Sequence, residues 1–218
     1  MYEGPAPAGL DAEAWRETRA HFIAGMRDAT LEEARQYLEG CEKTLAAFSQ
    51  HEEVVIWLDH RLSDQLILIK VLDWFSRQNL DGVKLSLICV GRYPGMDQFV
   101  GLGQLEASQL ASLAGTRLPA GEAQYRAAQA AWIQFTSPDP TPIQRFVETD
   151  TSALPFLATA LRRHLEQFPS LDNGQSRTER QVFFPFFMRM VRTPGHGSSA
   201  RYNDSRSRSL WVTARFTG

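Results

Sequence analysis

The chain has 218 residues with 23 basic and 25 acidic side chains, and this near balance excludes a global field that would attract nucleic acid or an anionic membrane. Its length suffices for one domain with an appendage. No apolar run approaches the length of a membrane-spanning helix, and the segment Met1 to Pro7 lacks the features of a signal peptide. We therefore expect a cytoplasmic protein without membrane contact.

The first 50 residues predict two helices after a Pro/Gly-rich entry segment, Glu3 to Gly9. Asp11 is placed to cap the first helix, and Thr30 and Glu33 form the pattern of a capping box at the start of the second. The cysteines at 41 and 89 lie in a helical pattern and in an apolar strand pattern, which indicates reduced structural thiols rather than a disulfide. The sequence offers no metal-ligand spacing.

The stretch from 54 to 90 predicts a strand, a crossover helix and a second strand, and it defines the fold class as α/β with a Rossmann-like parallel sheet fragment. The apolar runs are Val54–Leu58 and Lys84–Val90, and the helix between them has Ser63 as its expected cap. A crossover helix is the usual connection between parallel strands, and it is right-handed in nearly every case. We expect many helices to wrap this fragment.

A polar cluster follows the first strand, where open α/β sheets usually place a ligand. The candidate ligand-binding residues are those of this cluster and of a glycine-containing loop after the second strand: Asp59, His60, Asp64, Gln65, Gly101, Gly103 and Gln104. The helix N-terminus favours a phosphate or carboxylate there, but Asp59 and Asp64 oppose an anion unless Arg61, His60 or a metal offsets them. The alternative is structural, with Asp64 as a first-turn acid and Asp59 as a turn residue.

Helical patterns occupy 106–114, 121–135, 141–147 and 153–168, so the middle of the chain is rich in helix. An Asn-Gly turn at 173–174 and a capping box at Ser176 and Glu179 then open a last helix. This arrangement is typical of a helix-turn-helix or winged-helix element, with Arg177 and Arg180 as candidates for nucleic-acid binding. Arginine-bearing capped helices are also common in proteins that bind no DNA.

Several separated motifs resemble the bacterial family called Domain of Unknown Function 1835: Trp57–Leu66, Gly101–Leu105, Leu154–Leu165 and Asn173–Gln181. The last of them is similar to the start of the usual companion domain, Domain of Unknown Function 3658. The resemblance implies no activity and no cofactor. Members typically carry acid, histidine and acid in the strand-end motif, whereas this chain has Arg61 in place of the second acid and Ser63 in place of an aromatic residue.

The resemblance also implies that the chain is truncated at its start, because members usually begin with a further strand, turn and helix. A reading-frame slip after Gln181 is a second expectation. Pro185 falls inside the last helix, a basic Ser/Arg stretch follows, and the codons of Leu210–Phe216 can spell a family motif when read one nucleotide earlier. We accordingly expect an incomplete α/β domain at 1–170, the start of a winged-helix-like element at 171–191 and a disordered tail at 192–218.

Three functions remain open from the sequence. The first is a bacterial α/β domain that binds a small anionic or nucleotide-like ligand at the end of strand 54–58, as an enzyme or otherwise. The second is a regulator that acts on DNA or protein through its C-terminal element. The third is a helical interaction module. A serine nucleophile, a metal site and a Walker loop find no support in the sequence.

Overall fold

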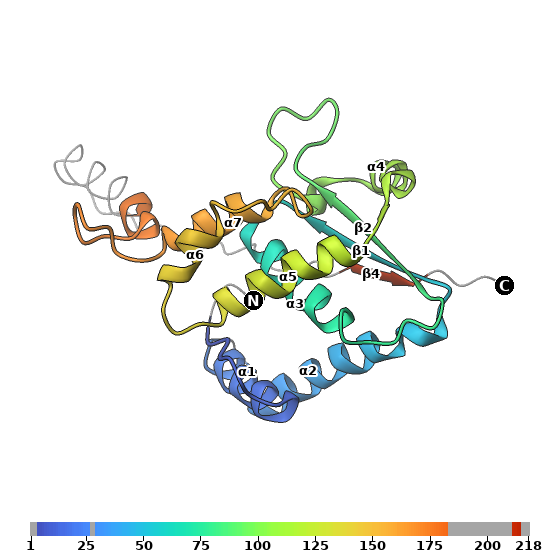
Figure 1. Cartoon of the computed structure of the whole chain (residues 1–218), viewed down its shortest axis with the longest axis horizontal. Coiled ribbons are helices and arrows are strands. Elements are labelled where there is room, and N and C mark those ends of the chain that lie inside the picture. Colours follow the sequence, from blue (N-terminus) through green and yellow to red (C-terminus); the bar gives the residue numbers. More distant parts are fainter. Residues whose placement is uncertain (1–3, 27–28, 183–210, 215–218) are drawn as a thin grey trace, which may run out of the picture.

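A small mixed sheet lies at the centre of the computed structural model, which describes residues 4–26, 29–182 and 211–214 (Figure 1). Its strand order is β3-β2-β1-β4. The central strands β1 (Glu53–Asp59) and β2 (Lys84–Val90) run parallel, with Glu53 opposite Lys84 and Asp59 opposite Val90. The predicted pair of adjacent parallel strands is confirmed, and the ends of both strands therefore meet at one edge of the sheet.

The outer strands are antiparallel, so the sheet is mixed rather than parallel throughout. β3 (Leu118–Pro119) pairs with β2, and β4 (Trp211–Ala214) pairs with β1. β4 falls within 192–218, for which the sequence predicts disorder. Of that stretch the structure describes only these four residues, and there it shows a strand; the rest of the predicted tail, and the predicted frame slip, lie outside the described residues.

The crossover helix α3 (Leu62–Phe75) is buried on most of its circumference because apolar residues nearly surround it. It packs between the sheet and helices α5 (Glu122–Phe135) and α7 (Leu157–Leu165), as Figure 1 shows. The fully buried members of this main core include Leu58, Leu66, Ile69, Leu72, Phe75, Leu157 and Leu161. This packing fixes the N-terminus of α3 against the end of β1.

The opposite face of the sheet has a smaller core of its own. Ile88 of β2 is buried there together with Leu102, Leu105 and Leu113. These leucines come from the one-turn helix η2 (Leu102–Gln104), from the residue after it and from α4 (Ala107–Leu113). The alternation of side chains along a strand thus gives β1 and β2 two buried faces, and it brings η2 to the carboxyl end of β1.

Helices α1 (Ala12–Met26) and α2 (Leu31–Ala46) form a pair below α3 (Figure 1). The predicted capping box of α2 is confirmed, because Glu33 N donates to Thr30 Oγ1 while the Glu33 carboxylate accepts from the amide of Thr30. Ion pairs from Arg16 to Glu42 and from Arg35 to Glu17 join the two helices. The one-turn helix η1 (Ala47–Gln50) leads into β1.

The remaining helical segments are the one-turn helix η3 (Ala114–Thr116), α6 (Thr141–Phe146) and a helix at 177–182. α7 begins at Leu157, four residues later than the pattern at 153–168 predicts. Pro155 explains this difference, since a proline disfavours helical backbone in the residue before it. Among the described helices, none is both long and apolar enough to cross a membrane.

Candidate functional site

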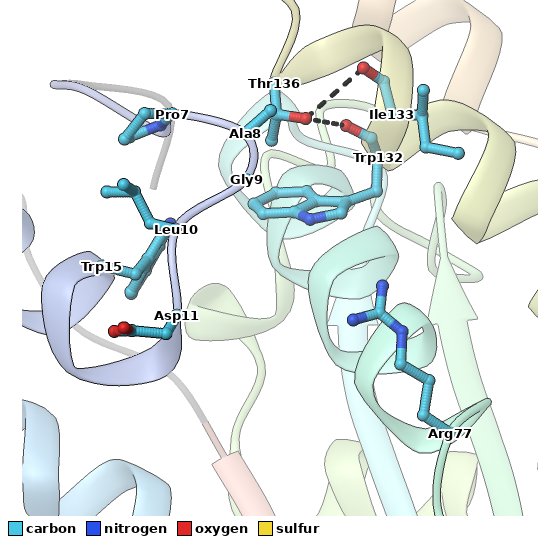
Figure 2. A pocket seen from close by; sticks show the side chains of 10 residues that line it. All are labelled: Pro7, Ala8, Gly9, Leu10, Asp11, Trp15, Arg77, Trp132, Ile133 and Thr136. Carbon is cyan, nitrogen blue, oxygen red and sulfur yellow. Dashed lines mark hydrogen bonds between the residues drawn. The ribbon is translucent and has the colours of Figure 1, made fainter.

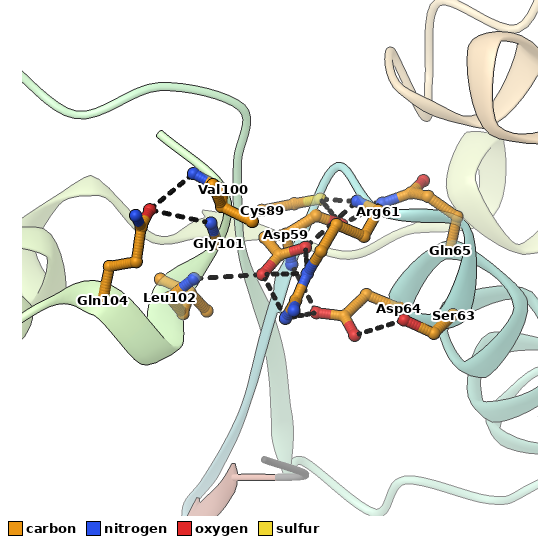
Figure 3. A network of polar contacts seen from close by, with 10 residues as sticks. All are labelled: Asp59, Arg61, Ser63, Asp64, Gln65, Cys89, Val100, Gly101, Leu102 and Gln104. Atoms are coloured by element: carbon orange, nitrogen blue, oxygen red, sulfur yellow. Dashed lines mark hydrogen bonds and ion pairs between the residues drawn. The ribbon is translucent and has the colours of Figure 1, made fainter. Parts of the chain in front are cut away.

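Asp59, the last residue of β1, is the centre of the polar network in Figure 3. Its side chain is fully buried and is paired with Arg61, whose Nε lies 2.9 Å from Oδ1 and whose Nη2 lies 2.8 Å from Oδ2. The amide of Arg61 also donates to Oδ1 at 3.0 Å. A two-point contact of this kind is a strong and directional form of ion pair. The side chain of Arg61 is 41% exposed, so the network reaches solvent on that side.

The same carboxylate holds the loop before α4. Leu102 N donates to Asp59 Oδ2 at 3.0 Å, although the two residues are 43 positions apart in sequence. Gly101 passes so close that a Cβ atom on it would lie 2.5 Å from Asp59 Oδ2 and 2.7 Å from Arg61 Cζ. Position 101 therefore needs glycine for space. Asp59 therefore connects the carboxyl end of β1 to η2.

Asp64, in the first turn of α3, adds a second carboxyl group to the network. Its Oδ2 accepts from the amide of Asp59 at 3.0 Å and lies 3.7 Å from Arg61 Nη2. Burial, and then the negative charge of Asp59, raise the pKa of Asp64 to about 6. Burial alone would raise the pKa of Asp59 as well, but the hydrogen bonds from the Arg61 side chain and from the amides of Arg61 and Leu102 outweigh it and hold that pKa below its usual value.

Ser63 is not the N-cap of α3. The helix begins at Leu62, so its N-cap is Arg61, whose carbonyl accepts from the amides of Asp64 and Gln65. Ser63 instead lies inside the first turn, where its hydroxyl is 3.4 Å from Asp64 Oδ1. The predicted serine cap is wrong, and the carboxylate of Asp64 serves the end of β1 rather than the helix amides.

Gln65 spans the ends of both central strands. Its Nε2 donates to the carbonyl of Asp59 at 2.7 Å and lies 3.3 Å from Cys89 Sγ. Burial raises the pKa of the Cys89 thiol to about 11, so this thiol is neutral, and both cysteines are free as predicted. Gln65 is 1% exposed, and its Oε1 is buried with no hydrogen-bond partner among the described residues.

His60 follows Asp59 and is tied to the neighbouring strand by its amide, which donates to Val90 O at 3.0 Å. Its ring lies between Phe99 and Phe156, with centroid distances of 6.0 and 6.3 Å. Nδ1 of His60 is buried and, within the described part of the chain, has no hydrogen-bond partner. Gly91 leaves room for the Phe156 ring, because a Cβ atom at position 91 would lie 2.5 Å from that ring.

Gly103 and Gln104 are exposed and do not join the buried network. Gln104 Oε1 accepts from the amides of Val100 and Gly101, so this side chain shapes its own loop. The structure thus brings Asp59, Asp64, Gln65 and Gly101 together, with His60 at the same strand ends. The first three are buried, so they do not line an open concavity in this structure.

The sequence-based set omits Arg61, Leu102, Phe99 and Phe156. The alternation of acids with Arg61 could have indicated the ion pair, but no local pattern places an amide at 102 or two distant phenylalanines beside His60. No group of three or more metal-ligating side chains lies close enough together to hold a metal ion within the described ranges. Both oxygens of Asp59 are instead engaged by Arg61.

The two C-terminal candidates for nucleic-acid binding, Arg177 and Arg180, differ in their contacts. Arg177 Nη1 lies 2.5 Å from Glu166 Oε2 and the Arg177 amide donates to Glu166 O, so its charge is used within the chain. Arg180 is exposed. The capping box predicted at Ser176 and Glu179 is confirmed, with Glu179 N donating to Ser176 Oγ at 3.2 Å. The remainder of the predicted winged-helix-like element, residues 183–191, lies outside the described residues.

Comparisons of the chain with family models, with curated proteins and with solved structures found no match. The similarity to Domain of Unknown Function 1835 therefore stays a proposal, and its support is the set of motifs quoted above. Function has to be argued from the strand-end geometry itself.

Proposed function

We propose that the chain binds a small nucleotide-like ligand at the carboxyl end of β1, where His60 and Gln65 contact a planar polar group of that ligand. The observation that carries this proposal is the pair of buried atoms, His60 Nδ1 and Gln65 Oε1, that have no hydrogen-bond partner among the described residues. Leaving such an atom unsatisfied costs about 1 to 3 kcal/mol, and buried polar atoms are rarely left so. A ligand that paired with both would recover that cost.

The charges of the network favour a base-like group over a free anion. One guanidinium, Arg61, faces two carboxyl groups, and its Nε and Nη2 are both engaged by Asp59. A phosphate alone would meet no uncompensated positive charge in this network. A planar base offers donors and acceptors to Gln65 and His60, and Phe99 and Phe156 supply aromatic surface beside it.

Access requires movement of the segment between β2 and η2. Residues 91–100 extend away from the body of the molecule (Figure 1), most of them are exposed, and Phe99 in this segment lies beside the His60 ring. Because the two unpartnered atoms are buried, a displacement of Phe99 would open the path to them. Binding would then order the segment over the ligand, as loops at ligand sites commonly do.

Thermal-shift assays with a panel of nucleosides, their monophosphates and inorganic phosphate test the proposal. We expect at least one nucleoside and its monophosphate to raise the melting temperature, and phosphate alone to leave it unchanged. His60→Gln should lose the response, whereas His21→Gln, at an exposed site on α1, should keep it. A panel without any response, an equal response to phosphate, or a full response in His60→Gln would each refute the proposal.

A further inference from the structure

Lys70 brings a side-chain amine to the side of α3 that meets α1. Its Nζ lies 2.9 Å from the centre of the Trp15 ring. Figure 2 shows Trp15 near the start of α1, where it lines an open depression of about 380 Å³ together with Leu10 and Asp11 of the entry segment. Lys70 itself is half-buried, so its amine stays within reach of a small solute. It shares no contact with the proposed nucleotide site.

The charged groups that act on Lys70 come from α1 and α2. The guanidinium carbon of Arg19 lies 5.9 Å from the centre of the same indole ring, and Arg19 is only 5% exposed. Its charge opposes a second cation there, and burial lowers the pKa of Arg19 itself. Glu42 and the thiol of Cys41 act in the opposite direction, but the Glu42 carboxylate is paired with Arg16 Nη1 at 2.6 Å. These surroundings favour a neutral or negatively charged group at the end of the lysine side chain.

The amine of Lys70 is available as a nucleophile near neutral pH. Burial, and then the charge of Arg19, lower the pKa of Lys70 to about 7. At pH 7.5 such an amine is about three quarters unprotonated, compared with about 0.1% for an exposed lysine of ordinary pKa. Only the unprotonated amine can attack a carbon atom, and desolvated lysines are the ones that enzymes use in this way. Lys70 therefore has several hundred times more free amine than a surface lysine.

We propose that Lys70 reacts reversibly with carbon dioxide and forms a carbamate that is held beside Arg19. The nitrogen lone pair attacks the carbon atom of carbon dioxide, one carbon–oxygen π bond opens onto its oxygen, and the nitrogen releases one proton to water. The product is a carbamate with one negative charge, R–NH–COO⁻. The reaction replaces the repulsion between two cations with an attraction between Arg19 and an anion.

Charge and size distinguish carbon dioxide from other reagents that amines accept. An aldehyde would leave an imine and an acyl donor would leave an amide, and neither product carries the negative charge that Arg19 favours. Carbon dioxide has three atoms, so it needs little space at a half-buried amine. The flexible stem of Lys70 lets the new carboxylate turn from the Trp15 ring toward Arg19. The chemistry of the site therefore points to carbon dioxide.

Formation of the carbamate should stabilise the folded chain. In the unfolded chain Lys70 has an ordinary lysine pKa and hardly any free amine, so it binds carbon dioxide far more weakly than in the folded chain. A solute that binds the folded state more tightly shifts the equilibrium toward that state. Because Lys70 lies where α3 meets α1, the contact between these helices should respond to the level of carbon dioxide.

Carbon-13 NMR of the whole chain with labelled bicarbonate at pH 7.5 tests the proposal. We expect a carbamate signal that saturates as dissolved carbon dioxide is raised and that is missing from Lys70→Met. Lys43→Met, at an 80% exposed position of α2, is the matched control and should keep the signal. Any carbamate on the terminal amino group is common to all three proteins, so the difference spectra isolate Lys70. A wild-type spectrum without any signal beyond those of Lys70→Met would overturn the proposal.

A second pair of measurements tests the role of Arg19 and the effect on stability. Arg19→Gln should lower the carbamate occupancy about threefold or more, because Lys70 then keeps its proton more firmly and the anion loses its partner. Arg126→Gln, at an exposed position of α5, should leave the occupancy unchanged. At constant pH and ionic strength, bicarbonate in place of chloride should raise the melting temperature of the wild type but not of Lys70→Met. Full occupancy in Arg19→Gln, or an equal rise in Lys70→Met, would contradict the proposal.

Discussion

At the scale of single residues, one buried carboxylate explains most of the strand-end geometry. Asp59 has no exposed surface, and its oxygens receive the Arg61 guanidinium and two backbone amides. Breaking a buried pair by removing one partner is costly because the other charge stays behind. Asp59 thus connects β1 to the η2 loop, and this structural role holds the end of β1 in place beside His60 and Gln65.

Asp59→Asn should lower the free energy of unfolding by about 1.5 to 3 kcal/mol, the range for hydrogen bonds to charged groups, because the Arg61 charge that stays behind is partly exposed. Urea denaturation at pH 7 measures it. Asp97→Asn, at an exposed position of segment 91–100, is the matched control and should change stability little. If the Asp59→Asn variant is as stable as the wild type, Arg61 contributes nothing through this contact.

Gly101→Ala should destabilise the chain by roughly 1 to 3 kcal/mol, the usual range for overpacking a closed site. The added methyl group would meet Asp59 Oδ2 at 2.5 Å and Arg61 Cζ at 2.7 Å. The control is Gly115→Ala in η3, where a Cβ atom meets nothing within 4 Å. If both alanine variants unfold at the same denaturant concentration as the wild type, the close approach of the loop is not real.

Asp64 should make stability depend on pH between about 4 and 6. Its pKa rises from 3.8 in the unfolded chain to about 6 in the folded one, so the folded state holds the extra proton in this window. Stability from this group is then fully present below pH 4 and is lost as the pH rises to 6. Relative to the wild type, Asp64→Asn should gain on the order of 1 to 3 kcal/mol over that window, at about 1.4 kcal/mol per pKa unit.

Chemical denaturation of both proteins at pH 4, 5 and 6 gives this difference. Asp97→Asn again serves as the control. A difference between Asp64→Asn and the wild type that stays constant over the three pH values would show that the pKa of Asp64 is the same in the folded and the unfolded chain, as for an ordinary first-turn acid.

At the scale of elements, α3 joins the sheet to helices on several sides. Its N-terminal turn carries the strand-end network, its middle packs against the sheet and α5, and Lys70 on its remaining side meets Trp15 of α1. The helix pair α1–α2 is therefore joined to the body through a partly charged amine over an aromatic ring. Burial, and then the charge of Arg19, make the charged form of this lysine costly in the folded chain.

Lys70→Met should stabilise the chain at pH 6, with a gain that shrinks as the pH rises to 9. The pKa of Lys70 falls from 10.5 in the unfolded chain to about 7 in the folded one, so the penalty of holding the charge is fully present below pH 7 and is relieved as the pH rises toward 10.5. Urea denaturation at both pH values tests this. Lys43→Met, 80% exposed on α2, should show no such trend. Loss of stability in Lys70→Met at both pH values would contradict the account.

At the scale of the whole molecule, sequence patterns predicted the central part of the fold well. The apolar runs at 54–58 and 84–90 and the capped helical stretches are local signals, and the parallel pair and the capping boxes at Thr30 and Ser176 follow from them. The edge strands escaped prediction because β3 has two residues, one of them Pro119, and β4 is four residues long and follows a polar, serine-rich stretch. Pairing with β2, rather than composition, makes the two residues of β3 a strand.

Only those residues of the candidate site that lie close together in the sequence could be predicted. Asp59, His60, Asp64 and Gln65 are near in sequence and follow a strand, so their gathering could be foreseen. Their contacts with Leu102, Phe99 and Phe156 could not, because these residues come from distant parts of the chain. In the folded chain the guanidinium of Arg61 pairs with Asp59, so it is not available to an anionic ligand.

The central claim is that a ligand completes the hydrogen bonding of His60, and the nitrogen NMR signals of the histidine rings test it most directly. Spectra are recorded with and without the nucleoside monophosphates of the panel, and His60→Gln assigns the signal. We predict that a stabilising nucleotide shifts the Nδ1 signal of His60 and leaves those of His21 and His164 in place. A nucleotide that raises the melting temperature while the His60 signal stays unmoved would contradict the claim, as would a panel that moves none of these signals.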